Sequence, residues 1–307
     1  MVAVFMGTPR FAVPTLEALV ASGHEVRAVY TQPDRPKGRG QELAMSPVKE
    51  CALRLGLPVF QPERVRRPEV IAQLAEFGAE AMVVVGYGQI LPQAIIDLAP
   101  SGIINVHASL LPKYRGAAPI QWAIANGERV TGVTTMRIDA GLDTGDMLLK
   151  TETAIGDDET APELSERLAA MGAALLIETL SGIGTIVPEK QNNAEATLAP
   201  ILKKEDGAID WTRPAGVIYA RLRGFTPWPG AFTTFRGAGL KVLSAAPADA
   251  TDLAPGEMRL RSRKLVVGCG EGTALELREV QPDGRKRVSG ESFSNGARLS
   301  DNELLGN

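Results

Sequence analysis

The sequence predicts an α/β fold, a doubly wound and mostly parallel sheet followed by a small β-barrel domain. Three observations support this prediction. The chain has 307 residues, more than one hydrophobic core usually serves, which favours two domains. Its first half alternates short apolar, β-branched runs with helical patterns, as βαβ units do. Beyond residue 209, short strand-like runs are separated by Gly, Pro and Asp, as in a small barrel.

The first half of the sequence predicts strands joined by helices. Residues 2–6 (VAVFM) predict a buried strand, and residues 11–21 predict a helix with one apolar face. Ser46 and Pro47 form an N-cap and N1 pair that opens a helix ending at Gly56. The other elements predicted in this half are strands at 25–30, 81–85, 102–106 and 133–138 and helices at 68–77 and 160–182.

The pattern changes after Gly184. Residues 185–206 have no sustained period and mix Pro, Asn and charge, which predicts an extended linker. A short helix is expected at 214–223. The strands expected after it lie at 232–235, 240–245, 264–269 and 274–280. The predicted boundaries are therefore a first domain at 1–188, a linker at 189–205 and a second domain at 206–307.

Composition narrows the class of protein. Hydrophobic residues make up 44% and charged residues 22% of the chain, as in a soluble globular protein. No apolar run approaches the roughly 18 to 20 residues of a membrane-spanning helix. The two cysteines and two histidines lie far apart, so we expect neither a disulfide framework nor a metal site. A reducing cytoplasm is the expected location. The oligomeric state is left open, with a monomer favoured.

Two stretches of the chain are locally basic although the formal net charge is −3. Residues 27–67 hold nine Lys or Arg against four acidic residues, and residues 258–290 hold eight against four. Such stretches suggest phosphate binding, whereas the alternative is ordinary solvated surface charge.

Common nucleotide and hydrolase motifs are missing. GTPRFA (7–12) follows the first strand but lacks the second and third glycines of G-x-G-x-x-G, and no P-loop sequence occurs. No G-x-S-x-G nucleophile elbow is present either. These absences argue against a dehydrogenase, an NTPase and a serine hydrolase.

Two polar segments follow predicted strands, NVHASLLPKYRG (105–116) and DAGLDTGD (139–146). Ligands of doubly wound sheets bind beyond the carboxyl ends of the strands, so we expect the two segments to meet there. An Asn amide can donate to a developing oxyanion, a His can take a proton near neutral pH, and an Asp can fix the imidazole tautomer. Without a strong nucleophile, this set suits direct transfer of an acyl group from a carrier to an amine.

The candidates from this reasoning are Asn105, His107 and one of three aspartates, Asp139, Asp143 or Asp146. Each has an ordinary structural alternative. Asn105 could terminate a strand, His107 could be a hydrogen-bonded core histidine, and the aspartates could form turns. Spacing alone does not choose among the aspartates.

NVHASLLPKYRGAAPIQ (105–121) together with GLDTGD (141–146) strongly resembles the folate-dependent formyltransferases. The GRG of residues 38–40 and FTPWPG (225–230) narrow the resemblance to the members that act on tRNA. The further stretches that carry it are GTPRFA (7–12), TQPDRPKGRG (31–40), SPVK (46–49), VVGYGQILP (84–92) and IDW (209–211).

The resemblance implies a Rossmann-like domain joined by a linker to an OB-like barrel. It implies transfer of the formyl group of 10-formyltetrahydrofolate to the α-amino group of methionyl initiator tRNA, by direct attack of the amine through a tetrahedral intermediate and without a metal. Residue by residue, Asn105, His107 and Asp143 match the family's catalytic trio. The residues that match its tetrahydrofolate-contacting segment are Ser109, Leu110, Leu111 and Pro112.

For tRNA, the resemblance matches Arg39 to an arginine that contacts the acceptor end. Arg39 lies with Arg35 and Lys37 in a loop at 34–45 that we expect to be mobile alone and ordered by tRNA. We expect a sequence-tolerant phosphate track in the second domain, where R-L-R-S-R (259–263) would put three arginines on one strand face. Its candidate members are Lys204, Arg261, Arg263, Lys264, Arg285, Lys286 and Arg287.

Two alternatives remain beside this interpretation. The first is a folate-dependent N-formyltransferase for a small amine such as a glycinamide nucleotide or an amino sugar. A second domain with its own basic cluster argues against this alternative, because it has no evident use in binding a small amine. The second alternative is a non-catalytic RNA-binding protein, against which the intact trio argues.

Overall fold

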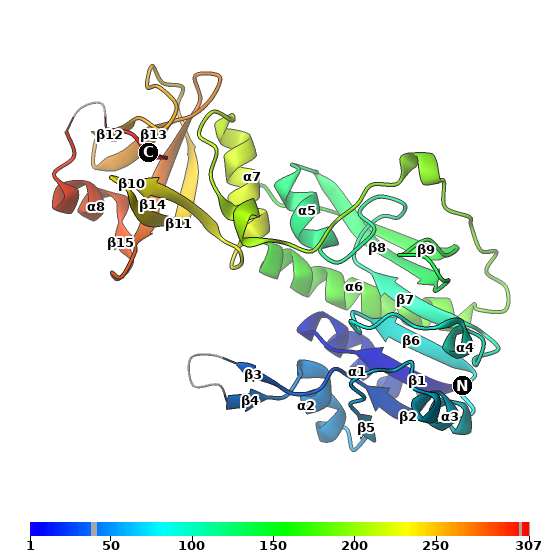
Figure 1. Cartoon of the computed structure of the whole chain (residues 1–307). Helices are drawn as coiled ribbons and strands as arrows, with labels where there is room; N and C mark the ends of the chain where they lie inside the picture. Colours follow the sequence, from blue (N-terminus) through cyan, green and yellow to red (C-terminus); the bar gives the residue numbers. More distant parts are fainter. Residues whose placement is uncertain (38–41, 301–302, 307) are drawn as a thin grey trace. The chain divides into compact units, whose positions relative to one another are not determined.

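The computed structural model describes residues 1–37, 42–300 and 303–306, and the chain divides into two compact units (Figure 1). Both units are discontinuous in sequence. The first comprises Met1–Pro119, Val130–Ala154 and Leu164–Pro200, and the second comprises Ile120–Arg129, Ile155–Glu163 and Ile201–Asn307.

A mixed sheet forms the centre of the first unit. Its strands, in spatial order, are β5 (Val59–Phe60), β2 (Glu25–Tyr30), β1 (Val2–Gly7), β6 (Ala81–Val85), β7 (Ile103–His107), β8 (Val130–Arg137) and β9 (Met147–Ala154). Pairing is parallel from β5 to β7, whereas β8 and β9 run antiparallel to their neighbours. The predicted mostly parallel α/β sheet is therefore confirmed.

Helices cover both faces of this sheet. They are α1 (Val13–Ala21), α2 (Pro47–Arg54), α3 (Pro68–Glu76), α4 (Gln93–Ile96) and α6 (Ala161–Ser181). Alternate residues of β1, such as Val4 and Met6, share a buried cluster with Leu74 of α3 and Ile95 of α4. The long helix α6 runs along the strands at the other end of the sheet (Figure 1). At Gly172 it approaches so closely that an added Cβ would lie 2.7 Å from Val106 Cγ1.

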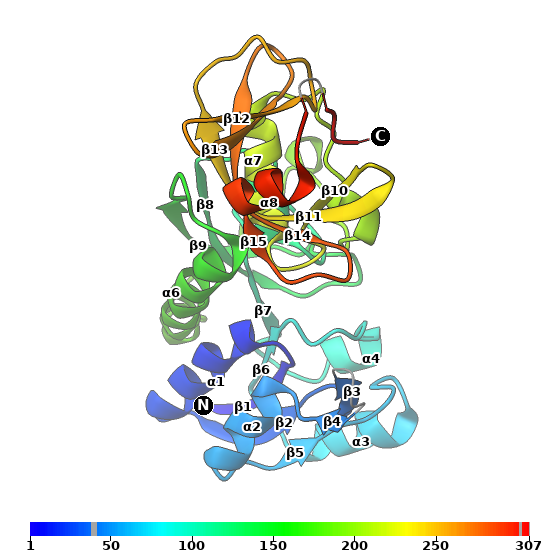
Figure 2. The same cartoon turned by 90° about the vertical axis from the view of Figure 1, so that its left-hand side faces the viewer.

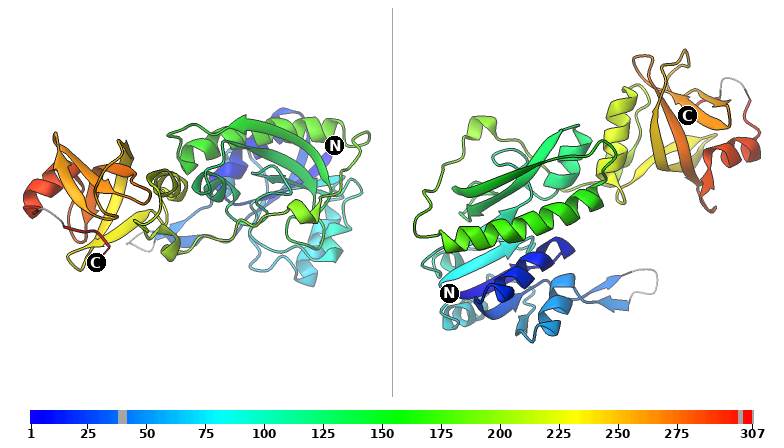
Figure 3. Two further views of the ribbon diagram at one scale, coloured as in Figure 1. Left: turned by 90° about the horizontal axis from the view of Figure 1, so that it is seen from above. Right: turned by 180° about the vertical axis from the view of Figure 1, so that it is seen from behind.

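The segment at 34–45, predicted as a loop, contains a β-hairpin. Its strands β3 (Arg35–Lys37) and β4 (Glu42–Ala44) are antiparallel and extend away from the sheet of the first unit (Figure 1; Figure 3). At its base, Asp34 Oδ2 lies 2.5 Å from Lys49 Nζ. Arg39 lies outside the described residues, so its predicted role stays a prediction.

Much of the segment predicted as a linker packs on the first unit. Glu189 forms an isolated bridge with Met147, and Leu198 forms one with Arg115. A short 3-10 helix, η2 (Asn193–Glu195), lies between them, and a second, η3 (Lys204–Gly207), follows in the second unit. The segment has no regular period because its hydrogen bonds go to other parts of the chain.

The second unit contains an antiparallel sheet with helices α7 (Ala215–Phe225) and α8 (Gly290–Ala297). In spatial order the strands are β10 (Ala231–Phe235), β11 (Ala238–Ala248), β14 (Ala274–Pro282), β13 (Lys264–Gly268) and β12 (Met258–Arg261), with β15 (Val288–Ser289) paired to β14. Figure 2 shows α8 beside β14 and β15. The predicted C-terminal β domain is confirmed, but no closed barrel is found among the described strands.

Residues near the C-terminus lie between the two edges of this sheet. Leu304 bridges Glu257, which precedes β12, and Leu305 bridges Phe235 at the end of β10. The backbone N–H of Leu305 donates to Gly256 O at 2.9 Å. The gap between β10 and β12 is thus partly filled by single bridges instead of a continuous ladder.

Two segments from the first half of the chain belong to the second unit. In α5 (Pro119–Ala125), the Trp122 ring packs edge-on against Phe225 of α7, with ring centroids 5.3 Å apart. In the other segment, Asp158 accepts a hydrogen bond from the Tyr219 hydroxyl at 2.7 Å. Within the described parts of the chain, no helix is long and apolar enough to cross a membrane.

Candidate active site

Two of the predicted residues lie together on β7, the last parallel strand of the sheet. Asn105 and His107 lie two positions apart on β7, so their side chains point to the same face. Both are buried, with exposed fractions of 8% and 6%. Neither is a loop residue, because the flanking backbone pairs with β6 on one side and β8 on the other.

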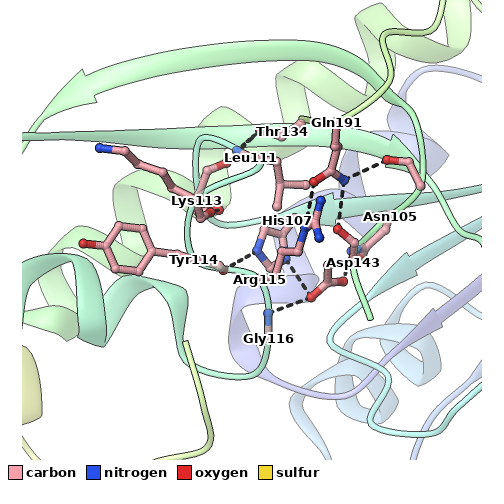
Figure 4. A network of polar contacts seen from close by, with 12 residues as sticks. Asn105, His107, Leu111, Lys113, Tyr114, Arg115, Gly116, Thr134, Asp143 and Gln191 are labelled. Atoms are coloured by element: carbon pink, nitrogen blue, oxygen red, sulfur yellow. Dashed lines mark hydrogen bonds and ion pairs between the residues drawn. The ribbon is translucent and has the colours of Figure 1, made fainter. Parts of the chain in front are cut away.

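Asp143 is the aspartate that reaches this pair, as Figure 4 shows. Its Oδ2 lies 3.7 Å from His107 Nδ1, and its Oδ1 accepts from Asn105 Nδ2 at 3.5 Å. The backbone N–H of Gly116 also donates to Oδ2 at 2.9 Å. One carboxylate therefore faces both the amide and the imidazole.

The neighbouring aspartates have other surroundings. Asp139 accepts from the Gly141 N–H at 3.0 Å and from the Thr144 hydroxyl at 2.7 Å, and these bonds fold the exposed turn. Asp146 accepts a backbone hydrogen bond from Arg137 through its carbonyl, at 2.9 Å. The structure thus identifies Asp143 as the aspartate of the site, a choice that sequence spacing alone does not make.

The turn at 139–146 reaches the site by a different route than we expected. We expected both polar segments to follow strand ends at the same edge of the sheet. Because β8 is antiparallel to β7, its register puts Thr134 beside His107 and Arg137 beside Ile104. The C-terminal end of β8 therefore lies beside the start of β7, away from His107. The turn that follows folds back and brings the Asp143 side chain to the site. Asp143 itself adopts a left-handed φ of 51° in this turn.

Both ring nitrogens of His107 face hydrogen-bond acceptors. Nε2 lies 2.9 Å from the carbonyl oxygen of Tyr114, and Nδ1 faces the Asp143 carboxylate. A carbonyl oxygen can only accept, so the hydrogen bond with Tyr114 requires a proton on Nε2. Asp143 faces the other ring nitrogen at a distance longer than a hydrogen bond.

The segment at 109–112 forms a compact turn under the site. Ser109 is fully buried, and its hydroxyl donates to the Lys113 carbonyl at 2.6 Å. The Thr134 hydroxyl donates to Ser109 O at 2.7 Å and accepts from Leu111 N at 3.1 Å. The Leu111 side chain is also buried, with 2% exposed, whereas Leu110 and Pro112 are partly exposed.

Residues that the sequence reasoning missed connect the site to the segment at 189–199. Arg115 is only 7% exposed, and its guanidinium donates to Gln191 Oε1 and to Asn193 Oδ1, at 2.9 Å each. The Gln191 amide in turn donates to the carbonyls of Asp143 and Gly145, at 2.8 Å each. Arg115 belongs to a stretch that carried the resemblance, but nothing in the sequence pointed to Gln191.

The prediction that R-L-R-S-R places three arginines on one strand face is wrong. Strand β12 ends at Arg261, which pairs with Lys264, so Ser262 and Arg263 form a two-residue hairpin turn. Both turn residues have positive φ, 48° and 68°. Alternation needs an extended strand, which stops before Arg263.

The predicted basic residues fall into two groups by their surroundings. Three of them pair with acids: Arg261 with Asp252 at 2.9 Å, Arg263 with Glu291 at 2.8 Å, and Lys264 with Glu276 at 3.4 Å. The exposed residues whose side chains have no recorded hydrogen bond or ion pair within the described chain are Arg35, Lys204, Arg285, Lys286 and Arg287. The side chain of Lys37 lies outside the described part of the molecule.

Comparison with known proteins agrees with this site. Residues 1–180 match the family described as formyl transferase, and residues 201–298 match its C-terminal domain. A methionyl-tRNA formyltransferase of Solibacter usitatus is 65% identical over 99% of this chain and 98% of its own length. One of Geobacter metallireducens is 51% identical over 99% and 98%. The chain belongs to the methionyl-tRNA formyltransferase family.

Solved structures of other proteins share the fold of this chain. An N-formyltransferase of Helicobacter canadensis, in complex with folinic acid and dTDP-3-aminofucose, aligns with a TM-score of 0.67 at 18% identity, over 92% of this chain and 98% of that one. HypX of Aquifex aeolicus, in complex with tetrahydrofolic acid, aligns with a TM-score of 0.63 at 17% identity, over 98% of this chain and 48% of that one.

Proposed function

We propose that the protein transfers the formyl group of 10-formyltetrahydrofolate to the α-amino group of methionyl initiator tRNA. The observation that carries the proposal is the single carboxylate of Asp143 facing both Asn105 and His107. It occurs in a chain that matches methionyl-tRNA formyltransferases over nearly their whole length.

The side chains at the end of β7 fit an acyl-transfer reaction. When bound, the folate would supply a formyl carbon that is open to attack by an amine. The Asn105 amide and a ring N–H of His107 are the buried candidates to donate to the oxygen that gains negative charge as the amine adds. Asp143 orients both donors and would balance charge that the ring gains during the reaction. The substrate amine is itself the nucleophile in direct attack, so no nucleophilic side chain is required.

His107 must give up a present contact before both side chains can donate to the developing oxyanion. His107 Nε2 is engaged by the Tyr114 carbonyl at 2.9 Å, and Nδ1 faces Asp143. Asn105 keeps a second amide hydrogen beyond its long contact of 3.5 Å with Asp143. We infer that the Asn105 amide can donate to the oxyanion as it stands, whereas His107 can donate only once its contact with Tyr114 is exchanged.

We assign folate contact to the turn at 109–112, as the resemblance implies. Support comes from its position near His107 and from the folinic acid and tetrahydrofolic acid bound in the two solved structures that share the fold. Because the side chains of Ser109 and Leu111 are buried, contact by this turn would come from its backbone and from Leu110 and Pro112.

We assign tRNA contact to the second domain and to the hairpin β3–β4. The family matches at 1–180 and 201–298 support a catalytic domain at 1–188, a linker at 189–205 and a tRNA-binding domain at 206–307. The bridges made by Leu304 and Leu305 support an OB-like barrel for that domain. This substrate implies a cytoplasmic location, and we retain a monomer as the proposed state.

The direct test is a formylation assay with methionyl initiator tRNA, 10-formyltetrahydrofolate and the full-length protein. We expect the α-amino group to lose its positive charge as it is formylated, which a charge-sensitive separation of methionyl-adenosine from its formylated form detects. Parallel reactions with a glycinamide nucleotide and a dTDP-amino sugar test the small-amine alternative. Formylation of either compound without formylation of the tRNA would overturn the proposal.

A further inference from the structure

Gln191 makes contacts that connect the catalytic turn to the rest of the first unit. The Arg115 guanidinium has only donors, so the Gln191 oxygen must be the atom that faces it, at 2.9 Å from Arg115 Nε. The amide nitrogen then faces the carbonyls of Asp143 and Gly145, which are 2.8 Å away and can only accept. The orientation of the amide is therefore determined by its partners.

The two carbonyls that Gln191 binds belong to the turn that carries Asp143. This turn is not part of a strand, and it holds Asp143 in a left-handed conformation that non-glycine residues adopt at a cost. The contact between Asp143 and Asn105 is long, at 3.5 Å, and the contact with His107 is 3.7 Å. The Gly116 N–H holds the carboxylate itself at 2.9 Å, whereas the two short hydrogen bonds from the Gln191 side chain hold the backbone of the turn that carries it.

Arg115 extends the same connection to the loop after β7. Its backbone pairs with the segment around Leu198, its N–H donating to Thr197 O and its carbonyl accepting from Ala199 N, at 2.9 and 2.7 Å. Its side chain donates to Gln191 and Asn193 of the same segment. The segment at 189–199 thus holds the loop behind His107 and the turn of Asp143 in one arrangement.

We propose that Gln191 is a positioning residue for formyl transfer, which holds the Asp143 turn so that its carboxylate faces both Asn105 and His107. This inference rests on the proposed function. Gln191 touches neither donor, and it acts through the backbone of Asp143. Misplacement of a reacting group by about 1 Å can cost on the order of 100-fold in rate, so the effect of losing Gln191 should fall on catalysis more than on binding.

The first experiment compares three variants of the full-length enzyme in the tRNA formylation assay. Gln191→Ala removes the whole amide side chain. Gln191→Glu keeps the size and the acceptor for Arg115, but it replaces the donor with an oxygen that faces two carbonyl oxygens. Asn192→Ala is the matched control, because the side chain of this exposed neighbour hydrogen-bonds, among the described residues, to Ala194 and Glu195 of its own segment.

We expect both Gln191 variants to lower kcat by about 10- to 100-fold with KM for both substrates little changed. The Asn192 variant should keep the wild-type kcat. Thermal unfolding of each variant is measured alongside, and Gln191→Glu keeps the test valid if Gln191→Ala unfolds, since it retains the pairing with Arg115.

The second experiment repeats Gln191→Ala in an Asp143→Ala background, by single-turnover assay with excess enzyme. If Gln191 acts by placing the Asp143 carboxylate, its loss should add little once that carboxylate is gone. A purely structural role would lower the rate by the same factor in both backgrounds. Equal factors, a wild-type kcat in both Gln191 variants, or an effect on KM alone would overturn the inference. An inactive wild type would instead overturn the proposed function, and this inference with it.

Discussion

The end of β7 and the basic turn before β15 differ in how exposed their charged side chains are and in whether those side chains have partners. At the end of β7, the Asp143 side chain is 18% exposed and has Asn105, His107 and Gly116 as fixed partners. In the turn at 285–287, three cations are exposed and have no recorded side-chain partner among the described residues. The first arrangement suits one defined reaction, because each group is oriented. The second suits the phosphates of nucleic acids of any sequence, because no partner among the described residues orients its three side chains.

The largest effects are expected where the charges are oriented. His107→Ala and Asn105→Ala should each lower kcat by about 100-fold or more, because each removes a donor to developing negative charge. Asp143→Asn should be similarly severe, since an amide does not balance an imidazolium. Single-turnover formylation measures the loss, and unchanged thermal unfolding shows that the fold is intact. Near wild-type rates for all three variants would remove this site from the mechanism.

Gly116→Ala tests how tightly the carboxylate is enclosed. Gly116 has a φ of 120°, and an added Cβ would lie 2.7 Å from the backbone oxygen of Ala199. Strained backbone of this kind costs about 1 to 3 kcal/mol. We expect a lower thermal stability and a lower kcat, because the N–H that binds Asp143 must shift.

The control for this substitution is Gly102→Ala, which has a positive φ of 85° but open space around the added Cβ. It should lose stability from backbone strain while keeping kcat. An equal loss of kcat in both variants would show that the close approach to Ala199 is unimportant for the site.

Removing the exposed cations should have a smaller effect that depends on salt. Alanine at Arg285, Lys286 and Arg287 together should weaken tRNA binding. For every phosphate that is no longer neutralised, the slope of log affinity against log salt should fall by roughly 0.7 to 0.9. Arg263→Ala is the comparison, because Arg263 already pairs with Glu291 and should change the slope less. A triple variant with the wild-type slope would show that the turn binds no phosphate.

The smallest effect is expected from pH at the base of the hairpin β3–β4. Hydrogen bonds from Lys49 and then from Gln61 hold the pKa of Asp34 below its ordinary value. The stabilisation from this lowered pKa is present above the unfolded-state pKa and is lost as pH falls through the folded-state pKa. An NMR titration should show the pKa of Asp34 rising in Lys49→Met. An unchanged titration would mean that this ion pair does not form in solution.

Most of the first sheet could be predicted because its central strands are short apolar runs. Of the strands missed in this sheet, β5 has only two residues and β9 has alternating burial at an edge. The separate hairpin β3–β4 contains Pro36, which argues against a strand. Helix α8 was also missed, since its sequence GESFSNGA contains two glycines and few good helix formers. Local propensity does not report these elements because tertiary contacts stabilise them.

The site divides in the same way. Asn105 and His107 follow from one strand and its alternation, which is local information. Asp143 came from the resemblance, and its route to the site was mispredicted because the direction of β8 is not visible in the sequence. Gln191 binds a turn that lies 46 to 48 positions earlier in the chain, and no periodicity reports such a pairing.

The discontinuous second unit has a consequence for folding during synthesis. Trp122 and Asp158 are made well before the residues that they contact, Phe225 and Tyr219. On the ribosome these two segments cannot reach their final neighbours until α7 has emerged, because α7 is synthesised later. The length of this delay follows from the elongation rate of about 5 to 20 residues per second. On the nascent chain, Trp122 therefore waits several seconds for the Phe225 ring that packs against it. For such a chain, translation speed through the region before α7 sets the time available for misassembly.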